Sequence, residues 1–445
     1  MGESRKPPLR VQFASKIKLA FHDATVTSDA GLLAYRELDE ALNLTPMASD
    51  VLSETRTGLN TQHRLQGLFR QSIYSRLAGY EDVNDAQRLC QDPAMRRVIG
   101  DRAKENLAAS ASEMGRFETQ TLSTNENVGA LMNLSGEWID RAHRHRKLDK
   151  IILDMDSSVS ETYGNQEGSA YNGHFGCTCY HPLFVFNQFG DLERAILRRG
   201  NHSSAKFWRQ VLNPVVERYR QQNIQRFFRG DSAFAKPSLF RYLEAEDFQY
   251  VIRLKANAVL QKKITHLMTR PVGRPPHRPT VFYCRFLYQA QSWTKSRLVI
   301  ARIAWHAGEL FPRVGFIVTN MTETSKRIVR FYNGRGKAEQ YIKAGKNALK
   351  WTKLSSRRFK NNQVRLQLFA LAYNLGNFLR QMALPRSVRH WSLTTLREKL
   401  IKIGAKVIQH STYVIFQLAE VAVPRRLFEL ILKRIGRLHP VLTPG

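Results

Sequence analysis

The chain has 445 residues, of which 43% are hydrophobic and 10% aromatic, enough to build cores and to exclude wholesale disorder. Its 69 Lys and Arg face 37 Asp and Glu, so the formal net charge is +32. Such an excess repels itself unless an anion binds, and the common anionic partners are nucleic acids and membrane surfaces.

Three features argue against a membrane or secreted protein. No uninterrupted apolar stretch approaches the roughly twenty residues of a transmembrane span. The start, MGESRKPPLRVQFASKIKL, lacks the apolar core of a secretory signal. Four cysteines, Cys90, Cys177, Cys179 and Cys284, are too few for a disulfide scaffold. We therefore expect a cytoplasmic protein that binds nucleic acid and no membrane.

The first half of the chain changes from helical to strand patterns. Residues 31–145 are predicted to be mostly helical, since apolar residues recur at three- and four-residue spacing. The run IILDMD (151–156) then predicts a strand. Further strands are predicted over 181–187, 192–199, 224–231 and 250–255, with helices over 204–221 and 237–246. This order predicts a mixed sheet with helices on its faces.

The second half begins with a β-rich region. Three runs predict antiparallel strands, and hence a β insertion over about 256–326: FYCRFLY (282–288), RLVIARIAW (297–305) and RVGFIVTN (313–320). Residues 325–382 are predicted to form a long, strongly basic helical stretch. Residues 392–438 are predicted to hold two strands and a helix.

Two acids stand out in these surroundings. Glu339 is the only acidic residue between 324 and 397; it either pairs with Arg335 or Lys343, one turn away, or has a functional role. Asp231 ends a predicted strand, where an aspartate either caps a turn or serves a site.

Asp154 and Asp156 lie on one face of the IILDMD strand. A carboxylate on a central strand is costly to bury without a cation or metal partner, so at least one of them is expected to have a partner. The first and fourth strands and a later helix can bring three acids together. Such a cluster binds Mg²⁺ or Mn²⁺, and two ions about 3.5–4 Å apart activate a water or a 3′-hydroxyl against a phosphodiester.

One spacing points to a family. Tyr332, Arg335, Glu339 and Lys346 stand in the pattern Y-x2-R-x3-E-x6-K. This pattern resembles the signature of a superfamily of bacterial insertion-sequence transposases, which carry a DDE triad on a ribonuclease H-like core. Four further stretches are similar to one family within it, so the similarity covers nearly the whole chain: LAGYEDVNDAQRLCQDP (77–93), YGNQEGSAYNGHFGCTCYHPLFVF (163–186), RGDSAF (229–234) and LIKIGAKVI (400–408).

The resemblance implies roles for the acids. Asp156, Asp231 and Glu339 match the three catalytic, metal-binding carboxylates of that superfamily, with Asp154 as the reserve for the first acid. The implied cofactor is a pair of Mg²⁺ or Mn²⁺ ions.

The resemblance also implies DNA contacts. Tyr332, Arg335 and Lys346 match the positions that hold the DNA backbone near the cut. The basic run that continues through Lys350 and Lys353 is either a solvated face or a phosphate-binding surface, and we expect the second.

Two weaker patterns remain. Trp293 lies in the predicted insertion, where related transposases place an aromatic residue that stacks on a flipped base; the alternative is a packed tryptophan. His174, Cys177, Cys179 and His181 are too tightly spaced for the usual zinc fingers, so zinc is not expected.

The sequence thus predicts an α/β fold: a ribonuclease H-like mixed-sheet core with an α-helical N-terminal domain, a β-strand insertion before the last catalytic helix, and a small α+β C-terminal region. The expected boundaries are 1–148 for the helical DNA-binding domain, 149–256 and 327–384 for the core, 257–326 for the insertion and 385–445 for the basic C-terminal region.

The expected function is that of a bacterial, nucleoid-associated transposase. It would bind the terminal inverted repeats of its element and target DNA, cut and join strands, and act as a homodimer in a synaptic complex. Two alternatives remain open: a ribonuclease H-like nuclease or resolvase without strand transfer, and a non-catalytic DNA-binding relative.

Overall fold

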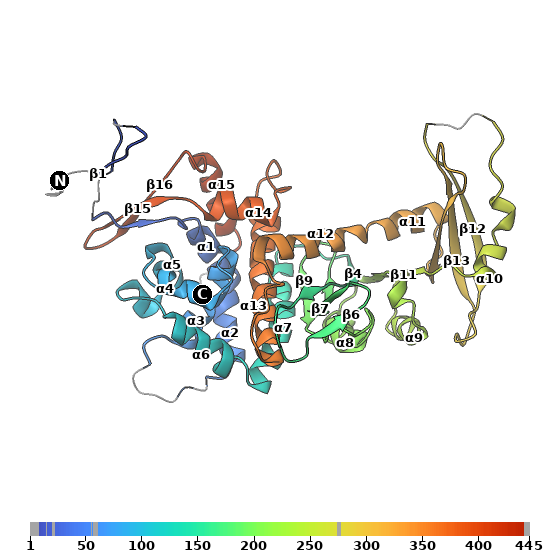
Figure 1. The fold of residues 1–445 in the computed structure, drawn as a ribbon, viewed down its shortest axis with the longest axis horizontal. Coiled ribbons are helices and arrows are strands. Elements are labelled where there is room, and N and C mark those ends of the chain that lie inside the picture. The colour runs from blue at the N-terminus through green and yellow to red at the C-terminus, as the bar shows by residue number, and fades with distance from the viewer. Residues whose placement is uncertain are drawn as a thin grey trace, which may run out of the picture.

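A large mixed sheet is the backbone of the fold. The computed structural model describes residues 9–14, 16–19, 23–54, 56, 61–273 and 277–439. The strands of the sheet are β4 (Lys150–Ser157), β8 (Leu183–Phe186), β9 (Leu192–Ile196), β10 (Gln225–Gly230), β11 (Gln249–Leu254), β12 (Thr280–Tyr288), β13 (Arg297–Trp305) and β14 (Arg313–Thr319). Their order in the sheet is β12-β13-β14-β11-β10-β4-β8-β9 (Figure 1). The predicted mixed α/β class is therefore confirmed.

The strand directions decide where the chemistry gathers. β4 pairs parallel with β10, and β10 pairs parallel with β11. β8 pairs antiparallel with β4 on the other side. The carboxyl ends of β4 and β10 therefore lie at the same edge of the sheet, where open α/β sheets bind their ligands.

The predicted β insertion continues this same sheet. β14 pairs antiparallel with β11, and β12 and β13 follow outward as antiparallel neighbours. The three antiparallel strands thus lengthen the core sheet at its far end, at the right of Figure 1. A short helix, α10 (Ala258–Lys262), leads into them, and residues 274–276 of the insertion lie outside the described residues.

Helices cover both faces of the sheet. α8 (Trp208–Arg220) and α9 (Pro237–Ala245) lie on one side, and α11 (Ser325–Asn333) and α12 (Gly336–Ala344) on the other (Figure 1). Alternation along β4 serves both faces: Leu153 and Met155 pack in the cluster under α8 and α9, and Ile152 packs with Ile328 of α11. Asp154 and Asp156 consequently face α11 and α12.

The N-terminal helices are α1 (Leu32–Leu42), α2 (Leu44–Val51), α3 (Leu65–Leu77), α4 (Ala86–Leu89), α5 (Pro93–Ile99), α6 (Ala111–Arg116) and α7 (Asn125–His143). α13 (Phe359–Phe378) is almost entirely buried and packs against α3, α7 and β9 at the centre of the molecule (Figure 1). One hydrophobic cluster therefore runs from the N-terminal helices through α13 to β8 and β9.

The long helical stretch predicted over 325–382 is broken twice. Gly334 separates α11 from α12, and a turn ends at Lys350, whose φ of 56° is left-handed, before α13 begins at Phe359. The first break falls at a glycine junction and the second at the polar run Ser355–Arg358, and both lie inside the stretch predicted as one helical unit.

Smaller sheets complete the fold. The predicted C-terminal strands and helix are β15 (Ala405–Gln409), β16 (Val414–Leu418) and α15 (Arg425–Gly436), preceded by α14 (Leu393–Leu396); β15 also pairs with β3 (Val26–Thr27) near the other end of the chain. β5 (Ser160–Glu161), β6 (Ala170–Asn172) and β7 (Cys177–Tyr180) form a sheet that the sequence pattern did not predict, and β1 (Leu9–Arg10) pairs with β2 (Lys18–Leu19).

Residues 1–8 and 440–445, which belong to the predicted first and last domains, lie outside the described residues. Among the described helices, none has the length and apolarity needed to cross a membrane.

Candidate active site

The three acids singled out in the sequence surround a single guanidinium group. Arg335 Nη2 lies 2.9 Å from Asp156 Oδ2 and 3.8 Å from Asp231 Oδ2. Arg335 Nη1 donates to Glu339 Oε1 at 2.9 Å. Residues that are more than a hundred positions apart in the chain therefore meet around one cation.

Local structure explains how each side chain arrives there. Asp156 lies near the end of β4, and Asp231 follows the parallel strand β10, so both leave the sheet at the same edge. Asp231 also caps a short 3₁₀ turn, since its Oδ1 accepts the Ala233 N–H at 2.9 Å. Arg335 stands at the beginning of α12, and Glu339 follows one helical turn later on the same face.

The electrostatics of the cluster are unbalanced. Burial raises the pKa of Asp156 to about 6; the Arg335 guanidinium opposes this rise, while the Asp231 and Glu339 carboxylates reinforce it. Burial alone would lower the pKa of Arg335, but the surrounding carboxylates raise it above its ordinary value. One cation among three acids leaves net negative charge, so the cluster attracts a further cation.

Asp154, the reserve for the first acid, belongs to a different pair. Its two oxygens accept hydrogen bonds from Arg229 Nε and Nη2, both at 2.6 Å. Arg229 Nη1 donates to the Phe331 carbonyl at 2.9 Å, and Asp154 is fully buried. Both aspartates of this strand therefore have the cationic partner that was expected of at least one of them. Asp154 is buried together with Arg229.

Asp156 and Asp231 line an open cavity of 870 Å³ at the edge of the sheet. Ser157, Lys236 and Lys255 also line it, as do residues of the β6–β7 turn and of the loop that precedes α8. The acids therefore face a space that can admit a substrate, with lysines beside it.

The donor set suits a hard divalent cation. Carboxylate oxygens are the ligands that Mg²⁺ and Mn²⁺ prefer, and here three of them converge on one positive group. In the described part of the chain, no three His, Cys, Asp or Glu side chains are drawn close enough together to hold an ion directly. The Arg335 guanidinium stands between the acids instead.

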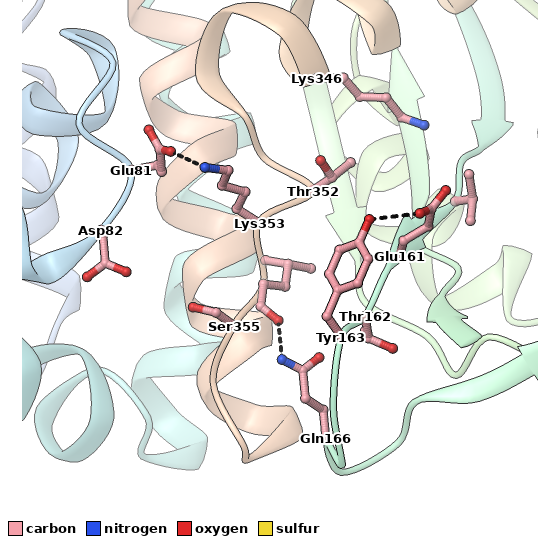
Figure 2. Close-up of a pocket in the computed structure, with 12 residues that line it drawn as sticks. Glu81, Asp82, Glu161, Thr162, Tyr163, Gln166, Lys346, Thr352, Lys353 and Ser355 are labelled. Carbon is pink, nitrogen blue, oxygen red and sulfur yellow. Dashed lines mark hydrogen bonds and ion pairs between the residues drawn. The ribbon is translucent and has the colours of Figure 1, made fainter. Parts of the chain in front are cut away.

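Lys346 lies on a second cavity, of 660 Å³, beyond the end of α12. Figure 2 shows the Lys346 side chain on the side of the cavity formed by Glu161 and Tyr163. The Tyr163 hydroxyl donates to Glu161 Oε2 at 2.9 Å. Burial lowers the pKa of Lys346, and the Glu161 carboxylate opposes this effect. Tyr332, at the end of α11, is half-buried beside Arg335.

Lys350 and Lys353 both contact one carboxylate from the N-terminal half of the chain. Lys350 Nζ lies 3.1 Å from Glu81 Oε1. Lys353 Nζ binds the same oxygen, a contact that Figure 2 shows. Burial would raise the pKa of Glu81, but the two ammonium groups hold it below its ordinary value. To contact a DNA phosphate, each lysine would therefore have to break its ion pair with Glu81 or keep it while binding the phosphate as well.

Trp293 is buried in the cluster beneath α9, on the face of the sheet opposite α12. Its ring meets Phe240 edge-on at 5.3 Å and Tyr288 at 5.4 Å. Trp293 is thus a packed core tryptophan in this structure, and its buried ring is not accessible to a DNA base.

The histidines and cysteines of 174–181 lie in three places: His174 in a turn, Cys177 and Cys179 in β7, and His181 in the connection that follows β7. His181 Nδ1 donates to the His202 carbonyl at 2.8 Å, and burial raises the pKa of Cys179 to about 11. Such a thiol is protonated at neutral pH when no metal is bound.

Two partners escaped the sequence patterns. Arg229 was predictable in principle, because parallel pairing of β4 with β10 places it opposite Asp154. Glu81 carried no such signal, because its contacts with Lys350 and Lys353 cross about 270 residues of chain.

Comparison with known proteins identifies the family of this chain. No curated protein matches the chain. Among solved structures, the piggyBac transposase synaptic complex with hairpin DNA is similar, at 11% identity and a TM-score of 0.42, with 99% of this chain and 89% of that chain covered; a likeness of this degree carries no part of the assignment. The family model described as Transposase DDE domain group 1 matches residues 9–440. This protein is therefore a member of the DDE transposase family, whose activity is transposition, a form of DNA recombination.

Proposed function

We propose that this transposase cuts a phosphodiester bond at each end of a bacterial insertion sequence and joins the freed 3′-hydroxyls to target DNA. The observation that carries the proposal is the meeting of Asp156, Asp231 and Glu339 around one cation beside an open cavity. Family membership supports the reaction class, and the cavity offers the space in which a DNA strand would lie.

The three acids would hold the divalent metal, Mg²⁺ or Mn²⁺ and two ions per site. When bound, such ions lower the pKa of a water or hydroxyl and stabilise the leaving oxygen. The chain's own residues do the rest. The 3₁₀ turn orients Asp231 through the Ala233 N–H, and the strand end orients Asp156. Arg335 and Tyr332 would hold the phosphate beside them, since a guanidinium matches phosphate oxygens in geometry and charge.

The partner is double-stranded DNA. Residues 321–380 contain 14 Lys and Arg against two acids, and residues 386–445 contain 11 against three, so the positive excess is concentrated around and beyond Glu339. Lys346, Lys350 and Lys353 extend this surface away from the acids. Affinity for DNA should therefore fall steeply with salt, because each neutralised phosphate releases counterions.

The remaining parts of the proposal concern assembly. The helical region 1–148 would recognise the terminal inverted repeats, and the strands of 257–326 would lie against the bound ends. Two ends must be brought together for transposition, so we propose a homodimer in the synaptic complex, acting in the bacterial nucleoid.

The test combines the protein with Mg²⁺, a terminal-repeat duplex taken from the DNA that flanks the gene, and a supercoiled target plasmid. We expect cut ends and joined products, both lost in Asp231→Ala and Glu339→Ala, while duplex binding is retained. Glu429→Ala, which removes an exposed acid of α15, is the matched control and should cut normally. Cutting without joining would favour a nuclease or resolvase, and binding without cutting a non-catalytic relative.

A further inference from the structure

Arg335 stands between the three acids that would hold the metal ion. Its two terminal nitrogens contact three carboxylates from three elements. A divalent ion coordinated by the same oxygens would lie beside this guanidinium, and the two positive charges would repel each other. Arg335 and the metal therefore compete for one set of ligands.

Arg335 is also held in a way that permits release. It stands between Gly334 and Gly336, at the junction of α11 and α12. Its Nε is buried but finds no hydrogen-bond partner among the described residues. The side chain of Glu339 is 65% exposed and that of Asp231 is 35% exposed, so two of its three contacts open to solvent.

We propose that Arg335 is an internal competitor of the catalytic metal, and that a phosphate of bound DNA draws it away from Asp156, Asp231 and Glu339 so that the ion can bind. This inference rests on the proposed function, in which Arg335 holds a phosphate. It makes DNA the condition for metal loading, because a phosphate supplies the replacement anion that the guanidinium needs.

Linkage then requires a reciprocal effect. If bound DNA raises the affinity of the site for the metal, the metal raises the affinity for DNA by the same factor. The free protein would keep its acids paired and hold metal weakly. A site that binds its metal ions only when DNA is bound does not activate water in the absence of its substrate.

The first experiment measures Mn²⁺ binding by calorimetry without DNA, in the wild type, Arg335→Gln and Arg330→Gln. Arg330 is an exposed arginine of α11 and controls for the loss of one positive charge near the site. We expect Arg335→Gln to bind Mn²⁺ at least about tenfold more tightly than the wild type, and Arg330→Gln to stay within about twofold. Equal or weaker binding by Arg335→Gln overturns the inference and leaves the proposed function standing.

A second arm covers the case in which Arg335→Gln does not fold. In the wild type, a terminal-repeat duplex should raise the affinity of the protein for Mn²⁺, measured after subtracting the Mn²⁺ that the duplex binds alone. Without DNA, Arg335→Lys should bind Mn²⁺ more tightly than the wild type, because the point charge of a lysine contacts fewer carboxylates. Tight Mn²⁺ binding by the free wild type, unchanged by DNA, overturns the inference. If no variant binds Mn²⁺ in either condition, the acid assignment of the proposed function falls, and the inference with it.

Discussion

Asp154 and Asp156 are two residues apart on β4, point to the same face of the sheet, and each faces an arginine, yet their surroundings differ. Asp154 receives two hydrogen bonds from Arg229, both at 2.6 Å, and neither side chain reaches the cavity. Asp156 has one contact, at 2.9 Å, with an arginine that it shares with Asp231 and Glu339, and its Oδ1 accepts the Ser157 N–H at 2.9 Å. Asp156 also lines the cavity.

The difference shows how one strand supports both structure and chemistry. A carboxylate matched one to one by a buried guanidinium is neutralised, and such a pair stabilises the fold only as long as it stays complete. A carboxylate that shares its cation with two others keeps unsatisfied charge and exchanges partners easily. Incomplete neutralisation beside a cavity, more than burial, distinguishes the candidate catalytic acid from the structural one.

The largest effect is expected from Asp156→Asn. Loss of this metal ligand should lower the rate of end cleavage by roughly 10³-fold or more, about 4 kcal/mol of activation free energy. The fold should remain intact, because the substitution removes a charge that Asp231 and Glu339 repel. Cleavage assays with Mg²⁺, together with thermal melting, check both statements. Near-normal cleavage by this variant would assign the first acid elsewhere.

Asp154→Asn should lower the stability of the fold and change the cleavage rate only modestly. It leaves the Arg229 guanidinium buried without its counter-charge, which costs about 3–5 kcal/mol of unfolding free energy. Cleavage per folded molecule, measured well below the melting temperature, should fall by less than about tenfold. Urea unfolding gives the stability. An unchanged stability with abolished cleavage would reverse the roles of the two aspartates.

The pH dependence of stability should show the smallest effect. Burial raises the pKa of Asp156 to about 6 in the folded protein, against about 3.9 in an unfolded chain. Between these values the folded state binds more protons at this carboxyl, so its contribution to stability is present below about pH 4 and is lost as the pH rises to about 6, by roughly 3 kcal/mol.

This loss is measured by urea unfolding of the wild type and Asp156→Asn in EDTA from pH 4 to 7. The asparagine variant should gain relative stability as the pH rises through that window and none above it. A constant difference across the range would show that burial does not raise the pKa of Asp156.

Much of the fold is legible in local patterns. The strand of IILDMD, its partners over 181–199, 224–231 and 250–255, and the antiparallel strands beyond 280 are all present, because alternation and apolar runs report burial directly. The prediction missed the breaks inside 325–382, one at a glycine junction and one at a left-handed Lys350, because a single residue's backbone conformation leaves little trace in residue spacing. Likewise, nothing local indicates that β14 pairs with β11 and so joins the insertion to the core sheet.

The sequence by itself determined the charge of +32, which calls for an anionic partner, and singled out the candidates through the lone Glu339 in a basic field and the Y-x2-R-x3-E-x6-K spacing. The reaction class followed from the resemblance of that spacing to a transposase signature. The charge and the spacing are properties of composition and of one short stretch of chain, residues 332–346. Only the tertiary structure paired Asp154 with Arg229, placed Asp156 beside Arg335, and packed Trp293 away from the acids. It also gave Lys350 and Lys353 a carboxylate partner in Glu81. The reason is physical: charge and spacing are local, whereas which cation neutralises which acid depends on how distant strands and helices pack.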